Sequence, residues 1–313
     1  MSVASPSWLS VAGPGLRALA GLATLLVTAC GQAGPGPEAK PEAPAKPGLW
    51  SVADEDTTIY LFGTIHMLPP GTGWRSAEVD HALGRSQALY LEADVVSDPA
   101  GQAAIVQRLG LLPAGERLSD KLPADEISRL RVAAGKLGVG METLEQTRPW
   151  YAAVLVTNAA IRAAGYSTDG GVEAGLRDDA RNAGKEMRYL ETVESQLSAL
   201  ADLPPETQSA YLSFTIDDFD TAPASLGQMV SAWRTGDADG LARVLIEDDM
   251  ARLPQLKEVL LDRRNTEWSR QLAALLAKEP GEFFVAVGAA HLVGPDSVQA
   301  RLKALGVENT RIQ

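Results

Sequence analysis

The sequence predicts an α/β or α+β fold in which a small mixed β-sheet is covered by many helices. Short apolar runs are interleaved with longer segments whose apolar residues recur at helical spacing. Two of the apolar runs end in the same way, with Gly-x-x-His, in residues 61–68 and again in residues 285–293. Histidine-bearing loops at strand ends are typical of sheets that bind ligands along one edge.

The predicted strands are short and rich in β-branched and aromatic residues. The runs LWSVAD and TIYLFG are separated only by EDT, so they predict a β-hairpin that delivers His66 at its end. A third run, SQALYLEADV, contains Glu92 within the predicted strand. The remaining candidates are EMRYLE, EFFVAVG and a weak terminal strand, NTRIQ.

Most of the other segments are predicted to be helical. Gly165 and Gly184 each close an apolar or amphipathic stretch, and Pro280 breaks a long run of regularly spaced leucines. The main predicted helices lie within residues 149–165, 170–184, 253–279 and 295–306.

The first 29 residues resemble a bacterial lipoprotein signal. Arg17 precedes an apolar stretch that is too short for a spanning helix, and small residues then lead to Cys30, the single cysteine. The resemblance implies cleavage before Cys30 and lipidation of its thiol. The alternative is an ordinary signal peptide with an incidental cysteine. In either case no disulfide can form within the chain.

The expected organisation is a signal peptide at 1–29, a lipidated Cys30 with a tether to residue 48, and one domain at 49–313. The tether follows from five prolines, four glycines and no apolar face in residues 31–48. The protein is therefore expected in the cell envelope. Gly31 resembles a signal for the outer membrane, facing the periplasm, in an organism with two membranes.

Composition argues against a nucleic-acid partner. The chain has 28 basic and 40 acidic residues, a net charge of −12, and no basic cluster. Its hydrophobic fraction of 45% is enough to fill a core. The expected partners are a membrane, through the lipid, and a peptide or small-molecule substrate of unknown identity.

The two Gly-x-x-His motifs supply the candidate site. In each motif the glycine allows a sharp turn at a strand end and leaves His66 or His291 accessible. Two imidazoles and a carboxylate would form a metal site with open positions for water and substrate. Glu92 is the best carboxylate because a charge among apolar residues is costly unless it is paired or coordinated; alternatively it faces outward on an edge strand. His81, on a short helix, is assigned a structural or surface role.

Other catalytic machinery is missing from the sequence. It contains no H-E-x-x-H, no G-x-S-x-G elbow, no Walker A loop and no G-x-G-x-x-G after a strand.

In combination, these motifs resemble those of the TraB/GumN family, also written TraB/PrgY/GumN. The resemblance covers residues 49–313. It rests, in chain order, on LFGTIHMLP, LYLEAD, RPWYAA, GVEAGLRDDARNAGKEMRYLETVESQL, WRTGD, RRNTEW and FVAVGAAHLVGPDSVQARLKALG. The family is related to the TIKI metalloproteases and is similar in fold to the erythromycin esterase and ChaN-like group.

The resemblance implies metal ligation by His66, Glu92 and His291. It also implies a metal-dependent hydrolase, with a peptidase preferred and manganese, cobalt or zinc as the divalent metal. One departure concerns Glu173, since Gly-Val-Glu stands here where many relatives carry Gly-Ile-Asp. If the acid at this position has a role in the family, Glu173 must fill that role with a side chain longer than that of aspartate.

A hydrolase of this kind needs a general base near metal-activated water. Glu173 and Glu191 are candidates by motif, although each could be a surface or capping carboxylate. Arg264 could stabilise an oxyanion or bind a substrate carboxylate, with Asn265 beside it, or it could form an ordinary salt bridge.

Two other functions remain open at this point. The same histidines could serve a non-catalytic envelope protein that binds haem, metal or a small ligand. The chain could also be a scaffold that keeps only the fold.

Overall fold

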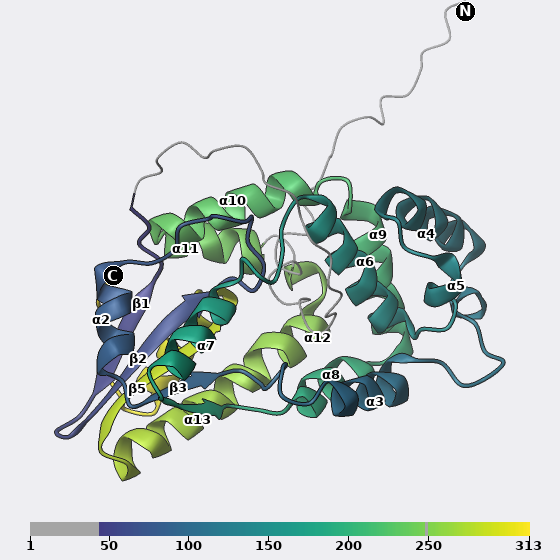
Figure 1. The fold of residues 1–313 in the computed structure, drawn as a ribbon. Coiled ribbons are helices and arrows are strands. Elements are labelled where there is room, and N and C mark those ends of the chain that lie inside the picture. Colours follow the sequence, from purple (N-terminus) through teal and green to yellow (C-terminus); the bar gives the residue numbers. More distant parts are fainter. Residues whose placement is uncertain (1–43, 248–249) are drawn as a thin grey trace, which may run out of the picture.

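The structure is a computed structural model that describes residues 44–247 and 250–313. A six-stranded mixed sheet has the order β4-β3-β5-β2-β1-β6, and helices surround it (Figure 1). This confirms the predicted fold class. The predicted signal peptide, Cys30 and most of the tether lie outside the described residues.

The predicted hairpin is confirmed, because β1 and β2 are antiparallel neighbours. β2 pairs in parallel with β5, β5 with β3, and β3 with β4. The carboxyl ends of these four strands therefore share one edge of the sheet, where ligands bind in open α/β sheets. The strands are β1 (Leu49–Ala53), β2 (Thr57–Thr64), β3 (Ala88–Leu91), β4 (Glu186–Tyr189), β5 (Gly281–Gly288) and β6 (Asn309–Arg311).

The helices fall into two groups in Figure 1. Those beside the sheet include α2, α7 and α13, whereas α4, α5, α6 and α9 form a helical part at the other end of the molecule. The helices are α2 (Ala77–Arg85), α3 (Pro99–Gly110), α4 (Ala124–Leu137), α5 (Met141–Leu144), α6 (Pro149–Ala163), α7 (Val172–Asn182), α8 (Val193–Ala201), α9 (Pro205–Asp218), α10 (Ala222–Thr235), α11 (Ala238–Ala242), α12 (Pro254–Lys257), α13 (Arg263–Lys278) and α14 (Val298–Ala304).

α6 is the centre of the helical part. It is buried along most of its circumference and packs against α4, α9 and α10. A helix that is apolar on all sides needs such complete cover. Gly165 follows it with a φ of 87°, in agreement with the predicted stop. None of the described helices is long and apolar enough to cross a membrane.

Three local details differ from the sequence predictions. Glu92 lies just beyond the end of β3 rather than inside the strand. The helix predicted over 253–279 is interrupted by a π-helical stretch, Glu258–Asp262, between α12 and α13. The last helix starts at Val298, after Pro295 and Asp296, because the Ser297 side chain caps it by accepting the N–H of Ala300.

Ordered contacts also begin before residue 49. Ala45 is buried, and the backbone N–H of Lys46 donates to the carbonyl of Arg234 at 2.7 Å. The side chain of Gln313 donates to the carbonyl of Pro47 at 2.8 Å. The last residues of the expected tether are therefore part of the folded unit.

Candidate metal centre

His66 follows the end of β2 and is oriented by α7. Its Nδ1 donates to Oε1 of Glu173 at 2.6 Å, and the Thr64 hydroxyl donates to the same oxygen. Gly171 makes this approach possible, because a Cβ there would overlap the carbonyl oxygen of His66. Burial lowers the pKa of His66, but the charge and hydrogen bond of Glu173 outweigh it and raise the pKa to about 9.

Glu92 lies at the end of an interior strand, since β3 has neighbours on both sides. The edge-strand alternative therefore does not apply, and only 12% of the Glu92 side chain is exposed. Its Oε1 accepts the backbone N–H of Gly288 at 2.6 Å, and its Oε2 accepts Nη2 of Arg264 at 2.5 Å. Burial raises the pKa of Glu92, but Arg264 and the two histidines outweigh it and lower the pKa to about 2.

His291 lies on a short 3-10 turn, Ala289–Leu292, directly after β5, and is fully buried. Its Nδ1 donates to Oδ1 of Asn265 at 2.5 Å, so its Nε2 carries the lone pair. Nε2 accepts Nη1 of Arg264 at 3.2 Å and lies 3.9 Å from Oε1 of Glu92. Burial and the charge of Arg264 lower the pKa of His291 to about 3, which keeps the imidazole neutral.

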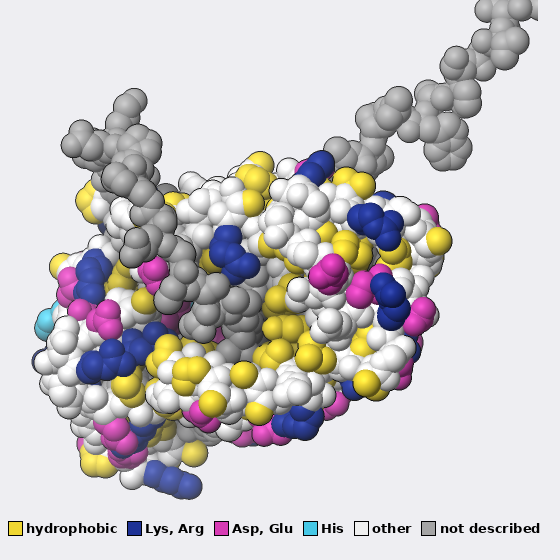
Figure 2. Space-filling model, turned by 45° about the vertical axis from the view of Figure 1, so that its right-hand side comes forward, with side chains coloured by type: hydrophobic (Ala, Val, Ile, Leu, Met, Phe, Trp, Pro, Cys, Tyr) yellow, Lys and Arg dark blue, Asp and Glu magenta, His cyan; other side chains and the backbone are white. Residues whose placement is uncertain are grey.

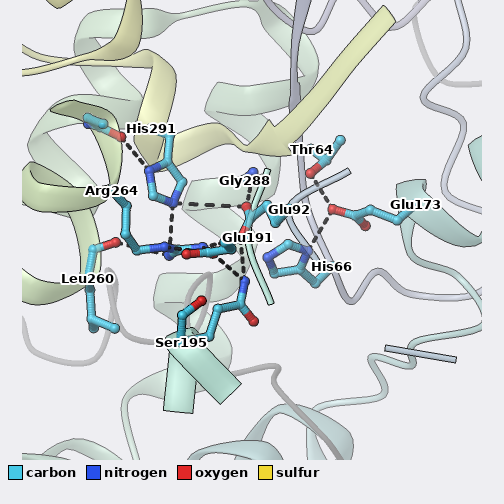
Figure 3. Close-up of polar contacts among 12 residues, drawn as sticks. Thr64, His66, Glu92, Glu173, Glu191, Ser195, Leu260, Arg264, Gly288 and His291 are labelled. Carbon is cyan, nitrogen blue, oxygen red and sulfur yellow. Dashed lines mark hydrogen bonds and ion pairs between the residues drawn. The ribbon is translucent and has the colours of Figure 1, made fainter. Parts of the chain in front are cut away.

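Arg264, at the start of α13, links the buried charges (Figure 3). Its Nη2 lies 2.5 Å from both Glu92 and Glu191, and its Nη1 donates to the carbonyl of Leu260 at 3.0 Å. The guanidinium also stacks on Trp268, with 4.6 Å from Cζ to the ring centroid. Arg264 is therefore fixed from several sides.

Asn265, the next residue, is fixed in turn. Its amide Nδ2 donates to the carbonyl of Asp296 at 2.9 Å, which leaves Oδ1 facing His291. This bond sets the orientation of the amide and hence the tautomer of His291.

Glu191 and Gln196 complete the buried cluster. Gln196 Nε2 donates to Glu191 at 2.6 Å and approaches Glu92 at 3.4 Å. Burial, with help from the charge of Glu92, raises the pKa of Glu191 despite Arg264. Oε1 of Gln196 is buried without a hydrogen-bond partner among the described residues. Sequence reasoning missed Gln196, although it lies in the ETVESQL stretch, because an amide there has no distinctive chemistry.

The three candidate ligands surround one point above Gly288. A Cβ on Gly288 would lie 3.2 Å from Oε1 of Glu92, 3.5 Å from Nε2 of His66 and 3.7 Å from Cδ2 of His291. Both histidines use Nδ1 for an outer partner, which is the usual arrangement of metal-ligating histidines. The types of donor therefore fit a divalent metal, which would have to displace the Nε2 proton of His66.

The arrangement is not a closed ligand cluster. Within residues 44–247 and 250–313, no group of three or more His, Cys, Asp or Glu side chains has the spacing of a metal site. The guanidinium of Arg264 instead interacts with both Glu92 and His291. A cation of the protein thus balances the buried carboxylates in this structure.

A cleft of about 670 Å³ opens beside these groups. His66, Glu92, Glu173 and Gln196 line one part of it, whereas α3 and Tyr151 supply an apolar wall. Figure 2 shows hydrophobic side chains gathered beside a hollow in the molecule. This volume is typical of sites that enclose a small molecule or a few residues of a peptide.

All seven residues predicted for the site within the domain lie in this region. His66 and Glu173 form one hydrogen-bonded group, and Glu92, Glu191, Arg264, Asn265 and His291 form the other. His81 is exposed on α2, as predicted.

The fold and this site define an α/β protein whose polar centre is built from two Gly-x-x-His loops at the carboxyl ends of parallel strands. The chain belongs to the TraB/PrgY/gumN family, whose model matches residues 48–311.

The chain is similar to curated proteins of two kinds. It is 26% identical to the uncharacterized protein YbaP of Escherichia coli over 246 residues, covering 78% of this chain and 88% of YbaP. It is 26% identical to Metalloprotease TIKI1 of Danio rerio, covering 86% of this chain and 63% of that protein. Metalloprotease TIKI2 of Danio rerio is also 26% identical, with 80% and 57% covered. No solved structure matches the chain.

Proposed function

We propose that this protein is a divalent-metal-dependent hydrolase that cleaves peptides. The observation that carries the proposal is the convergence of His66, Glu92 and His291 around the open face of Gly288, beside a cleft. The similarity to proteins named metalloproteases supports it.

In this proposal, each residue of the centre has a definite task. Glu173 and Asn265 hold the Nδ1 protons of His66 and His291, so a metal would bind at Nε2. It would displace the Nε2 proton that His66 carries at neutral pH and the Arg264 N–H that His291 accepts. Arg264 keeps Glu92 ionised in a buried setting. When bound, a divalent metal ion supplies a Lewis acid that activates water and polarises a carbonyl oxygen.

Of the two carboxylates predicted as general base, Glu173 is the better placed. Glu173 lines the cleft, whereas Glu191 is not among the lining residues and is engaged by Arg264 and Gln196. We therefore assign proton transfer at the cleft to the Glu173 carboxylate and assign Glu191 to the positioning of Arg264.

Metal content, measured by mass spectrometry after reconstitution with manganese, cobalt or zinc, tests the proposal. We expect near-stoichiometric metal in the unsubstituted protein, loss in His66→Ala and His291→Ala, and no change in His81→Ala, which alters an exposed histidine. Absence of metal from the folded, unsubstituted protein would exclude a metallohydrolase. A Soret band after incubation with haem would then favour the binding protein instead.

Gly288→Ala provides a steric test of the same centre. The residue has a φ of −51°, which alanine adopts freely, and the new methyl group would occupy the space between Glu92 and His66. We expect a folded protein with at least tenfold weaker metal binding and little peptidase activity. Gly84→Ala is the control, because nothing lies within 4 Å of a Cβ there. Unchanged metal affinity in Gly288→Ala would place the metal elsewhere.

We also propose that a lipid on Cys30 anchors the protein to a membrane of the cell envelope, with the outer membrane preferred. This rests on the short apolar leader that ends at the single cysteine. Incorporation of labelled fatty acid, lost in Cys30→Ala together with membrane association, would support the anchor. Retention of both in that variant would refute it.

A further inference from the structure

One wall of the cleft is apolar. It is formed by Val95 and Val96 after β3, by Val106 on α3, and by Leu111 and Tyr151. Val96 is 38% exposed, a large fraction for an aliphatic side chain. Such a wall suits an apolar side chain of a bound peptide.

One cationic side chain interrupts the cleft lining. Among the described residues that line it, Arg177 is the sole Lys or Arg. Its Nε is buried, and none of the described residues gives it a hydrogen-bond partner. Arg181, one turn further along α7, pairs instead with Asp178. A buried donor without a partner carries a cost that a ligand can remove.

The position of Arg177 relates it to the candidate centre. Arg177 and Glu173 are four residues apart on α7, so they share a face of the helix and are separated by about 6 Å along its axis. An extended peptide advances roughly 3.3–3.6 Å per residue. A peptide that runs along α7 would therefore place Arg177 one or two residues away from a bond cleaved beside His66 and Glu173.

The other charges of the cleft restrict where an anion can bind. Glu92, Glu173 and Asp169 line the cleft and repel a second carboxylate. Of the described residues in this lining, Arg177 alone offers a guanidinium, which binds a carboxylate through two parallel hydrogen bonds. A carboxylate of a bound substrate is therefore best accommodated beside Arg177.

We infer that Arg177 binds a carboxylate of the substrate, one or two residues from the cleaved bond, while the α3 wall takes an apolar side chain. This inference rests on the proposed peptidase function. The carboxylate is either the free C-terminus of a peptide or an acidic side chain within it.

Three fluorescent peptides test the inference by binding alone. The first is dansyl-Gly-Leu-Leu-Gln with a free carboxylate, the second is its C-terminal amide, and the third is the amide with Glu in place of Gln. Binding is measured by anisotropy on EDTA-treated full-length protein, so that no peptide is cleaved. We expect at least one carboxylate peptide to bind ten- to a hundredfold more tightly than the neutral amide. The tighter of the two identifies the source of the carboxylate.

Arg177→Gln should remove this preference, Arg177→Lys should restore part of it, and Arg181→Gln should leave it intact. Equal binding of all three peptides, absence of binding at millimolar concentration, or a preference that persists in Arg177→Gln would overturn the inference. Hydrolysis is scored separately with metal added. A carboxylate preference without cleavage would refute the peptidase function and leave the role of Arg177 standing.

Discussion

Arg264 forms ion pairs with two buried carboxylates of the site. One guanidinium stands between two carboxylates, Glu92 and Glu191, and all three side chains are at most 13% exposed. Buried charges are stable only when they are paired and hydrogen-bonded. The centre therefore depends on Arg264 for its folding, whatever its role in chemistry.

Arg264→Ala should lower the free energy of unfolding by about 3–5 kcal/mol, because it leaves two buried carboxylates without a cation. Urea denaturation measures this effect. Arg263→Ala, which changes an exposed neighbour paired with Glu258, should change it by less than about 0.5 kcal/mol. Equal stability of the two variants would contradict the ion-pair arrangement described here.

Glu173→Gln should separate positioning from proton transfer. The amide oxygen can still accept the Nδ1 proton of His66, but the amide cannot take a proton from water. Metal content should therefore persist while kcat falls by roughly 10²–10⁴. Glu194→Gln, an exposed change on α8, should keep full activity. If Glu173→Gln retains more than a tenth of kcat, the base is another group.

At the scale of elements, the site depends on how closely α7 approaches the loop after β2. The N–H of Val172 donates to the carbonyl of Ile65 at 3.1 Å, and Gly171 lies against the His66 carbonyl. A side chain at Gly171 would separate the helix from the strand end. The glycine is thus required by contact distance, since its φ of −65° is ordinary.

Gly171→Ala should therefore destabilise the protein by roughly 1–3 kcal/mol and weaken metal binding, because Glu173 moves away from His66. Thermal unfolding and metal titration report the two effects. Gly135→Ala, in an open position on α4, serves as the control and should be neutral or slightly stabilising. Normal metal affinity in Gly171→Ala would show that α7 does not position His66.

The elements themselves were largely predictable from the sequence. The hairpin, β4, β5 and the terminal strand lie in the short runs that predict strands, and Gly165 and Gly184 marked helix ends correctly. The π-helical stretch before Arg264 could not be predicted, because an apolar pattern at helical spacing does not distinguish π from α turns over five residues.

The site was only partly predictable. Repetition of Gly-x-x-His pointed to His66 and His291, and a charge in an apolar run pointed to Glu92. Arg264 is hydrogen-bonded to Glu191, which lies 73 positions away in the sequence, and to Glu92, which lies 172 positions away. Such contacts follow from tertiary packing, which local patterns do not encode. The apolar wall of the cleft was missed for the same reason.

At the scale of the molecule, the segment before β1 belongs to the folded unit. A chain that starts at residue 49 loses the hydrogen bonds made by Lys46, Pro47 and Gly48, whose carbonyl accepts the N–H of Gly63, together with the burial of Ala45. We expect its Tm to be roughly 6–12 °C below that of a chain starting at residue 44, as three hydrogen bonds of about 1 kcal/mol each predict. Calorimetry measures the two Tm values, and equal values would show that residues 44–48 do not contribute to stability.

The order of strands in the sheet has a consequence for biosynthesis. β5 lies between β3 and β2, yet it is made after all the other strands except β6. Until residues 281–288 have left the ribosome, no strand joins β3 and β4 to β2 and β1, and His291, which follows these residues, has not emerged either. At 5–20 residues per second, a nascent chain therefore carries His66 and Glu92 for about ten seconds or more before a complete centre can form. The candidate centre can therefore assemble only after β5 and His291, which follows it, have been made.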